Sequence, residues 1–132
     1  MNKIYITWHT VEILVDNLHR KILKTNFEAE HIMGLPRGGL IPAVILSHKM
    51  GIPLTNNILD DKILIIDDIC DSGETLQKFS KFHTAALHYK PHTSIFEPHF
   101  YANTHNSDGW IVYPWENKDS KPIQDYKNKI NG

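Results

Sequence analysis

Residues 63–76 read ILIIDDICDSGETL, a buried strand followed by a polar loop. The run from Lys62 to Ile66 is almost entirely branched and apolar, which is typical of a strand covered on both faces. Two carboxylates, Asp67 and Asp68, stand at its carboxyl end, and a helix is predicted from Thr75 to Phe82. Because open α/β sheets bind ligands at the carboxyl ends of their strands, this stretch indicates both a fold class and the place of a site.

Strand and helix patterns alternate along the rest of the chain. The predicted elements are a strand at Ile4 and Ile6, a helix over Val11 to Ile22 capped by Thr7, a strand over His31 to Leu35, a helix over Leu40 to Ser47 closed by Gly51, and short strands at Ala85 to Tyr89, Ser94 to Phe96 and Trp110 to Tyr113. This order predicts an α/β fold with a largely parallel sheet flanked by helices and joined by right-handed crossovers.

The loop after the acidic pair has the composition of an anion site. Ser72, Gly73 and Thr75 allow close backbone approach and add hydroxyl donors, and a helix start there adds unpaired N–H groups. Asp67 and Asp68 can accept sugar hydroxyls or bind Mg²⁺, so a phosphorylated sugar suits both halves. The alternative is a strand end followed by an ordinary turn and helix cap.

The order of four apolar residues, two acids, two apolar residues and D-S-G-x-T resembles the motif with which type I phosphoribosyltransferases bind 5-phosphoribosyl-1-pyrophosphate (PRPP). The resemblance implies that Asp67 and Asp68 hold the ribose hydroxyls, directly or through Mg²⁺. It also implies that Asp71, Ser72, Gly73, Glu74 and Thr75 cradle the 5-phosphate, with Asp71 as the catalytic carboxylate. The Glu74 side chain is expected to face solvent, since it would otherwise repel the phosphate.

A glycine turn, Leu35-Pro36-Arg37-Gly38-Gly39, precedes that motif. A glycine pair before a helix is weak evidence alone. In this order along the chain, the turn resembles the diphosphate loop of the same family, with Arg37 and the amides of Gly38 and Gly39 facing the leaving diphosphate. Arginine suits this task because its planar fork pairs with two phosphate oxygens.

The remaining matches resemble the bacterial xanthine-guanine phosphoribosyltransferases. They are YITW at residues 5–8, Tyr89-Lys90-Pro91, and WIVYPWE at residues 110–116. The resemblance implies a small base-binding hood in which Lys90 donates to the 6-oxo group of a purine. Trp110 would stack on the base, the backbone of Ile111 would meet its edge, and Glu116 would be a further acid near the metal and diphosphate.

Plainer interpretations stay open for these residues. Trp110 and Trp115 could be core aromatics, and Lys90 could be a solvated charge. Cys70 is expected to fill space in the interior, because nothing in the motif would activate its thiol. His88 and His92 are four residues apart, but Pro91 interrupts any helix that would align them for a metal.

One departure from the family is large. The xanthine-guanine enzymes carry a long flexible loop that closes over the active site, whereas here Thr55 to Asp61 alone connects Leu54 with Lys62. A closing lid excludes water and completes a site, so its loss puts catalytic efficiency in question. The alternative function is therefore a non-catalytic regulator that binds PRPP or a nucleotide; an RNA-binding attenuator would need a basic face.

Composition limits the remaining possibilities. The 132 residues are 41% hydrophobic and 22% charged, with a net charge of −1 and Cys70 as the single cysteine. These values predict one globular domain in a reducing cytoplasm, without a disulfide, a membrane span or a broad grip on nucleic acid. We expect a domain over residues 1–116 and a polar tail over 117–132, last anchored at Ile123 and Tyr126. The resemblance implies a homo-oligomer, a dimer or higher.

Overall fold

The computed structural model describes residues 2–117, so the predicted tail anchors Ile123 and Tyr126 lie outside the described residues. Its elements, in chain order, are β1 (Lys3–Tyr5), α1 (Trp8–Leu23), β2 (His31–Gly34), α2 (Leu40–Met50), β3 (Ile63–Cys70), α3 (Glu74–Gln77), β4 (His83–Tyr89), β5 (Phe100–Thr104) and β6 (Trp110–Val112). Within these residues, no helix is long and apolar enough to cross a membrane.

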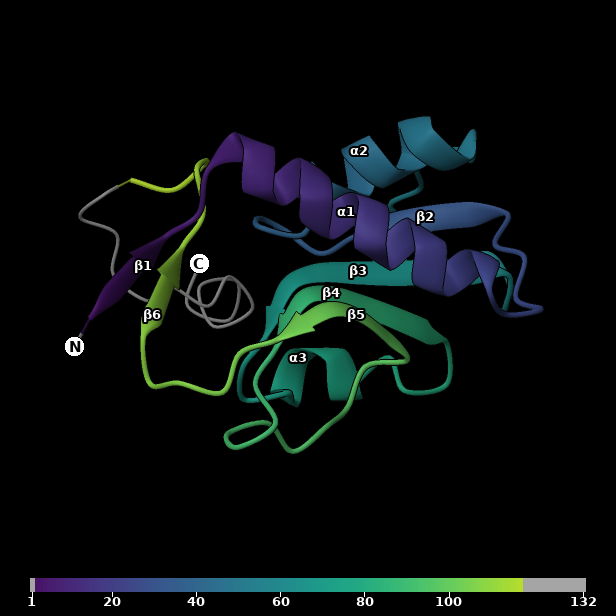
Figure 1. The fold of residues 1–132 in the computed structure, drawn as a ribbon. Helices are drawn as coiled ribbons and strands as arrows, with labels where there is room; N and C mark the ends of the chain where they lie inside the picture. Colours follow the sequence, from purple (N-terminus) through teal and green to yellow (C-terminus); the bar gives the residue numbers. More distant parts are fainter. Residues whose placement is uncertain (1, 118–132) are drawn as a thin grey trace, which may run out of the picture.

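The strands form two parallel sheets. The larger has the order β2-β3-β4-β5, and the smaller joins the two ends of the described chain as β1-β6. Figure 1 shows α1 and α2 over one face of the larger sheet and α3 on the other, with the small sheet on the side toward which the arrowhead of β5 points. The predicted α/β fold with a parallel sheet flanked by helices is confirmed.

The two long helices form where the sequence predicts them. The Thr7 side chain accepts a hydrogen bond from the Thr10 amide and caps α1, whose apolar stripe from Val11 to Ile22 is buried against the sheet. Gly51, with φ of 66°, ends α2 in the left-handed conformation that favours glycine. These local signals fix how the helices cover the sheet.

The central strand is longer than predicted. β3 continues beyond Ile66 to Cys70, because its pairing with β4 extends to Cys70 opposite Tyr89. Its pairing with β2 ends at Ile66 opposite Gly34. Asp67 and Asp68 therefore lie within the strand, at the point where it loses one neighbour, rather than beyond its end.

The helix predicted from Thr75 to Phe82 is shorter than expected. α3 covers Glu74–Gln77, and the amides of Lys78, Phe79 and Phe82 then bond to carbonyls three residues earlier. Tight turns of this kind do not continue an α-helix.

The strand predicted at Ser94 to Phe96 is wrong, and β5 at Phe100–Thr104 was missed. The Ser94 hydroxyl accepts the amide of Phe96 in a local turn, which removes that amide from any sheet. β5 alternates a buried Phe100 and Ala102 with a half-buried Tyr101, but only five residues carry this pattern before polar sequence resumes.

Candidate active site

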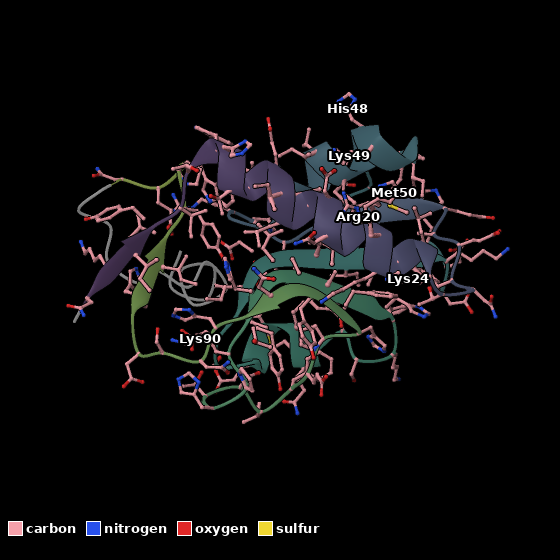
Figure 2. All side chains as sticks on the ribbon, in the orientation of Figure 1. Arg20, Lys24, His48, Lys49, Met50 and Lys90 are labelled. Atoms are coloured by element: carbon pink, nitrogen blue, oxygen red, sulfur yellow. The ribbon has the colours of Figure 1, made fainter. Side chains whose placement is uncertain are left out.

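Three loops that follow β2, β3 and β4 carry most of the predicted site residues. Because these strands are parallel and adjacent, their carboxyl ends lie at one edge of the larger sheet. Lys90 follows β4 directly and lies at the end of the sheet nearest β6 in Figure 2, away from the basic side chains of α1 and α2. The loops therefore share one edge, as the sequence predicts.

The glycine turn after β2 lies directly against the acidic pair of β3. A β-carbon at Gly38 would overlap the carboxylate of Asp68, and one at Gly39 would overlap the carbonyl of Ile66 and crowd the Cα of Asp67. Only a residue without a side chain allows this approach. Arg37, in the middle of the turn, is exposed. The structure thus brings the predicted diphosphate loop and the predicted ribose-binding acids into contact.

Both acids are half-buried, and each holds the backbone beside it. The Asp67 Oδ1 accepts the Asp68 amide at 2.9 Å, and the Asp68 Oδ1 accepts the Ile69 amide at 2.8 Å. These bonds fix one oxygen of each carboxylate relative to the strand. The pair is therefore presented in a defined orientation at the sheet edge.

The predicted phosphate loop is covered by the segment after Lys90. Gly73 has φ of 82°, and a β-carbon there would overlap the Ser94 hydroxyl and crowd the Phe96 amide. The Ile95 amide also donates to the Ser72 carbonyl at 2.9 Å. Thr75 is half-buried, whereas Glu74 is exposed, in agreement with the expectation that its side chain faces solvent.

Asp71 and Lys90 are brought together. The Lys90 Nζ lies 3.6 Å from the Asp71 Oδ1, and the Lys90 side chain is 10% exposed against 40% for Asp71. The interpretation of Lys90 as a solvated charge is therefore wrong. Thr93, which sequence reasoning missed, places its hydroxyl 2.9 Å from both the carbonyl and the Oδ1 of Asp71. Because Thr93 and Asp71 are 22 residues apart, no local sequence motif indicates this contact.

Glu116 reaches the same region from the end of the described chain. Its Oε2 accepts the Tyr113 amide at 2.7 Å. Burial is the main cause that raises the pKa of Glu116, and the negative charge of Asp68 adds to it, while the Tyr113 amide and Arg37 act in the opposite direction. The charges of Asp68 and Arg37 therefore act on the pKa of Glu116 in opposite directions.

A buried pair, Tyr113 and His88, was also missed. The Tyr113 hydroxyl donates to the Asp68 carbonyl at 3.0 Å and lies 2.8 Å from the His88 Nδ1. Burial, with a smaller contribution from His105, lowers the pKa of His88 to about 4. Burial also raises the pKa of Tyr113 well above its usual value. Both groups are therefore neutral near pH 7.

The predicted base-binding residues lie in the small sheet. Trp110 and Ile111 belong to β6, opposite Lys3 and Ile4 of β1. Trp110 is half-buried, and Ile111 is buried in the core. β6 leads directly into Tyr113, which contacts Asp68.

Two other residues behave as structural groups. Trp115 stacks on Tyr113 at a centroid distance of 4.8 Å, which agrees with its interpretation as a core aromatic. Cys70 is buried, and burial raises the pKa of its thiol, so it fills space as predicted.

The acidic groups suit Mg²⁺ bound together with a phosphorylated ligand. Among residues 2–117, no group of three or more His, Cys, Asp or Glu side chains forms a complete metal cage. Mg²⁺ is usually held by one or two carboxylates, with substrate phosphates and water as its other ligands. Asp67 or Asp68, each half-buried in β3, can supply such a carboxylate, and the Asp68 carboxylate lies against the glycine turn.

The connection before β3 is as short as the sequence indicates. Leu54 forms an isolated bridge with Ile32, and β3 begins at Ile63. Between them, Thr55 is half-buried and residues 56–62 are exposed.

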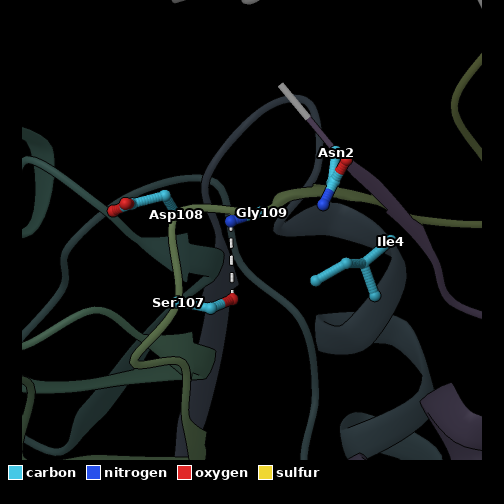
Figure 3. A pocket seen from close by; sticks show the side chains of 5 residues that line it. All are labelled: Asn2, Ile4, Ser107, Asp108 and Gly109. Carbon is cyan, nitrogen blue, oxygen red and sulfur yellow. Dashed lines mark hydrogen bonds between the residues drawn. The ribbon is translucent and has the colours of Figure 1, made fainter.

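A separate open cavity of about 470 Å³ lies between the first strand and the loop before β6 (Figure 3). Its lining residues are Asn2, Ile4, Ser107, Asp108 and Gly109. None of the predicted site residues lines this cavity, and the Asp108 carboxylate points away from Ile4 in Figure 3. The candidate active site is therefore the sheet edge described above.

Comparison with known proteins agrees with this architecture. No family model matches the chain. A solved structure of a purine phosphoribosyltransferase from Pyrococcus horikoshii is 30% identical, with a TM-score of 0.78 over 94% of this chain and 100% of that one. A xanthine-guanine phosphoribosyltransferase from Gluconobacter oxydans is 28% identical over 83% of this chain and 86% of that protein. The Helicobacter pylori xanthine-guanine-hypoxanthine phosphoribosyltransferase, 18% identical with a TM-score of 0.75, shares the fold over 99% of each chain.

These similarities cover between 83% and 99% of the chain. With the packing of the glycine turn on the acidic motif, they show that the chain belongs to the type I phosphoribosyltransferases. It is an enzyme of the purine phosphoribosyltransferase group.

Proposed function

We propose that this enzyme transfers the ribose 5-phosphate of PRPP to a 6-oxopurine, either hypoxanthine, guanine or xanthine, and releases diphosphate. The observation that carries the proposal is the contact of Gly38 and Gly39 with Asp68 and Asp67. PRPP carries its diphosphate on C1, next to the 2- and 3-hydroxyls of the ribose. A diphosphate loop and a ribose-binding acidic pair must therefore be neighbours, as they are here.

In this proposal, each part of PRPP has its own loop. The 5-phosphate binds the loop from Asp71 to Thr75, through backbone amides and the hydroxyls of Ser72 and Thr75. The ribose hydroxyls bind the acidic pair, and the diphosphate binds Arg37 and the amides of Gly38 and Gly39. Support comes from the shared edge of the sheet and from the contact of Gly38 with the Asp68 carboxylate.

The purine binds on the side of the small sheet, which serves as the hood. Lys90 donates to the 6-oxo group, Trp110 stacks on the ring, and the backbone of Ile111 meets the base edge. Lys90 is mostly buried and pairs with Asp71, so a 6-oxo group would share an ammonium that is already oriented. A 6-amino group offers no acceptor to it, which favours 6-oxopurines.

The reaction breaks the bond from C1 to the diphosphate oxygen and forms a bond from C1 to a purine nitrogen. Positive charge develops on the sugar ring in the transition state, as in glycoside hydrolysis. The Asp71 carboxylate, held by Thr93 and Lys90, balances this charge or accepts a proton from the base. Asp67 or Asp68 would hold Mg²⁺, which would neutralise and orient the diphosphate, and Glu116 would be a further acid nearby. The predicted three-ligand set of Asp67, Asp68 and Glu116 is not present, because the described residues contain no group of three such side chains that could hold a metal ion.

The test is a panel of purine bases assayed with PRPP and Mg²⁺. We expect release of diphosphate and formation of a nucleoside 5′-monophosphate with at least one 6-oxopurine, and little with adenine. An Asp71→Asn variant should bind PRPP but turn over slowly. Tight PRPP binding without turnover on any base would support the second candidate, a PRPP-binding regulator, which the short and exposed connection before β3 favours.

The proposal also concerns the state of the enzyme in the cell. We propose a cytoplasmic homo-oligomer, a dimer or higher, that acts on PRPP and a purine base without nucleic acid. Light scattering coupled to size-exclusion chromatography measures the oligomeric state, and a monomeric mass at micromolar concentration would contradict that part.

A further inference from the structure

Tyr113 makes polar contacts with three residues from a buried position. Its hydroxyl donates to the Asp68 carbonyl at 3.0 Å and contacts the His88 Nδ1 at 2.8 Å, and its amide donates to the Glu116 Oε2 at 2.7 Å. We propose that Tyr113, oriented by His88, is a positioning residue that holds Asp68 and Glu116 in the arrangement PRPP and Mg²⁺ require. This inference rests on the proposed function of those two acids.

The proton positions in this chain of hydrogen bonds follow from simple accounting. A phenol carries one proton, and Tyr113 donates it to the Asp68 carbonyl. His88 must then donate from Nδ1 to the Tyr113 oxygen, which requires the Nδ1–H tautomer of the neutral ring. Burial keeps the pKa of His88 near 4, which agrees with a neutral imidazole. His88 therefore fixes the direction in which the phenol proton points.

The Tyr113 ring is held in place from another side. It is stacked with the Trp115 ring at an interplanar angle of 1°, and Trp115 in turn contacts Trp8 at a centroid distance of 5.8 Å. A ring packed in this way cannot swing its hydroxyl away from Asp68 without disturbing both tryptophans. The contact with Asp68 is thus built into the core.

The position of Tyr113 in the chain explains why such a contact matters. Tyr113 follows β6, which carries Trp110, and it contacts Asp68 of β3 across 45 residues. The Asp68 carbonyl faces Tyr113 while its carboxylate lies against Gly38. Tyr113 therefore joins the segment proposed for the base to the strand proposed for the sugar.

The test begins with Tyr113→Phe, which removes the hydroxyl and keeps the stacked ring. Loss of one buried hydrogen bond should raise the PRPP dissociation constant and KM roughly five- to tenfold, with a smaller change in kcat. In the ligand-free protein, hydrogen–deuterium exchange of a peptide covering residues 67–70 should become faster. The matched control is Thr84→Val, which loses a buried hydroxyl contact of 3.0 Å with the His99 Nδ1 near the amino end of β4 and should leave PRPP affinity unchanged.

Two variants at His88 separate positioning from packing. His88→Asn places an amide N–H close to the position of Nδ1 and should keep PRPP affinity within about twofold of wild type. His88→Leu retains an apolar group of similar size but no donor, and should behave like Tyr113→Phe. This pair also decides the proposal if Tyr113→Phe fails to fold.

The proposal is overturned if folded Tyr113→Phe has the PRPP affinity of the wild type and the same rate of amide exchange at residues 67–70. It is also overturned if the two His88 variants lose PRPP affinity to the same extent. Calorimetry of PRPP binding and the exchange experiment need no turnover. A wild type without base-dependent turnover would therefore refute the proposed function alone, and these two readouts would still decide the role of Tyr113.

Discussion

Gly38 lies against the carboxylate of Asp68 so closely that any side chain at position 38 would overlap it. Gly38 lies in the turn after β2 and Asp68 lies within the neighbouring strand β3, and the two strands run parallel through four paired positions. The glycine turn therefore packs directly against the Asp68 carboxylate in the candidate site. Changes on either side of this contact should affect the binding of the same ligand.

Replacement of Gly38 by alanine should weaken PRPP binding. The new methyl group must displace the Asp68 carboxylate or the turn itself, so we expect KM for PRPP to rise at least roughly tenfold, or about 1.4 kcal/mol. The control is Gly51→Ala, where no atom lies within 4 Å but φ is 66°. That variant should lose about 1 kcal/mol of unfolding free energy and keep its KM. Equal effects of the two variants on KM would contradict the steric argument.

Asp68→Asn should lower the affinity for PRPP in the presence of Mg²⁺. The amide oxygen can still accept the Ile69 amide, so the strand should be preserved while one negative charge is lost. We expect an affinity loss of about tenfold by calorimetry at fixed Mg²⁺. Asp60→Asn is the control, because the Asp60 Oδ1 also accepts a backbone amide, from Lys62, outside the site. Unchanged binding in Asp68→Asn would remove Asp68 from the metal and ribose site.

Lys90 should determine the preference for 6-oxopurines. Lys90→Met should lower kcat/KM for hypoxanthine by roughly a hundredfold, because the buried hydrogen-bond donor is lost. The ratio of kcat/KM for hypoxanthine to kcat/KM for adenine should therefore fall. The control, Lys49→Met, breaks an ion pair with Asp16 on the helical face and should leave this ratio unchanged. A wild type that uses adenine faster than the 6-oxopurines would show that Lys90 does not have this role.

Stability should fall as the pH decreases from 6.5 toward 4. Burial lowers the pKa of His88 from 6.5 to about 4, so the unfolded chain takes up a proton in this range and the folded chain does not. Stability is therefore greatest above pH 6.5, and this group accounts for a loss of about 2 kcal/mol between pH 7 and 5. Urea denaturation measures the unfolding free energy at pH 7 and at pH 5. The loss between these two pH values should be about 2 kcal/mol smaller in His88→Asn than in the wild type. The same difference in both proteins would mean that His88 does not resist protonation.

Much of the fold could be predicted from the sequence because its signals are local. The cap at Thr7, the glycine after α2 and the apolar run of β3 each act within a few residues, and each has the predicted effect. Both loops of the candidate site could be located in the sequence for the same reason. Arg37 to Gly39 and Asp67 to Thr75 are contiguous motifs at the ends of recognisable strands.

The residues that were missed act over long separations. Thr93 contacts Asp71 across 22 residues, and Tyr113 contacts His88 across 25 and Asp68 across 45. Periodicity describes which face of an element is buried, but not which distant side chain it meets. β5 was missed because its short alternation merges into a polar segment, and Ser94 to Phe96 looked like a strand although its backbone bonds serve a turn.

The most direct test of the account is the ratio of nucleotide formed to diphosphate released, with PRPP, Mg²⁺ and guanine or hypoxanthine. Transfer predicts a ratio near one with a suitable base. Without base, diphosphate should still be released at a measurable fraction of that rate, because the short connection from Thr55 to Asp61 leaves water access to C1. The central claim would be contradicted if diphosphate were released but no nucleotide formed with any 6-oxopurine. It would also be contradicted if no diphosphate were released at all.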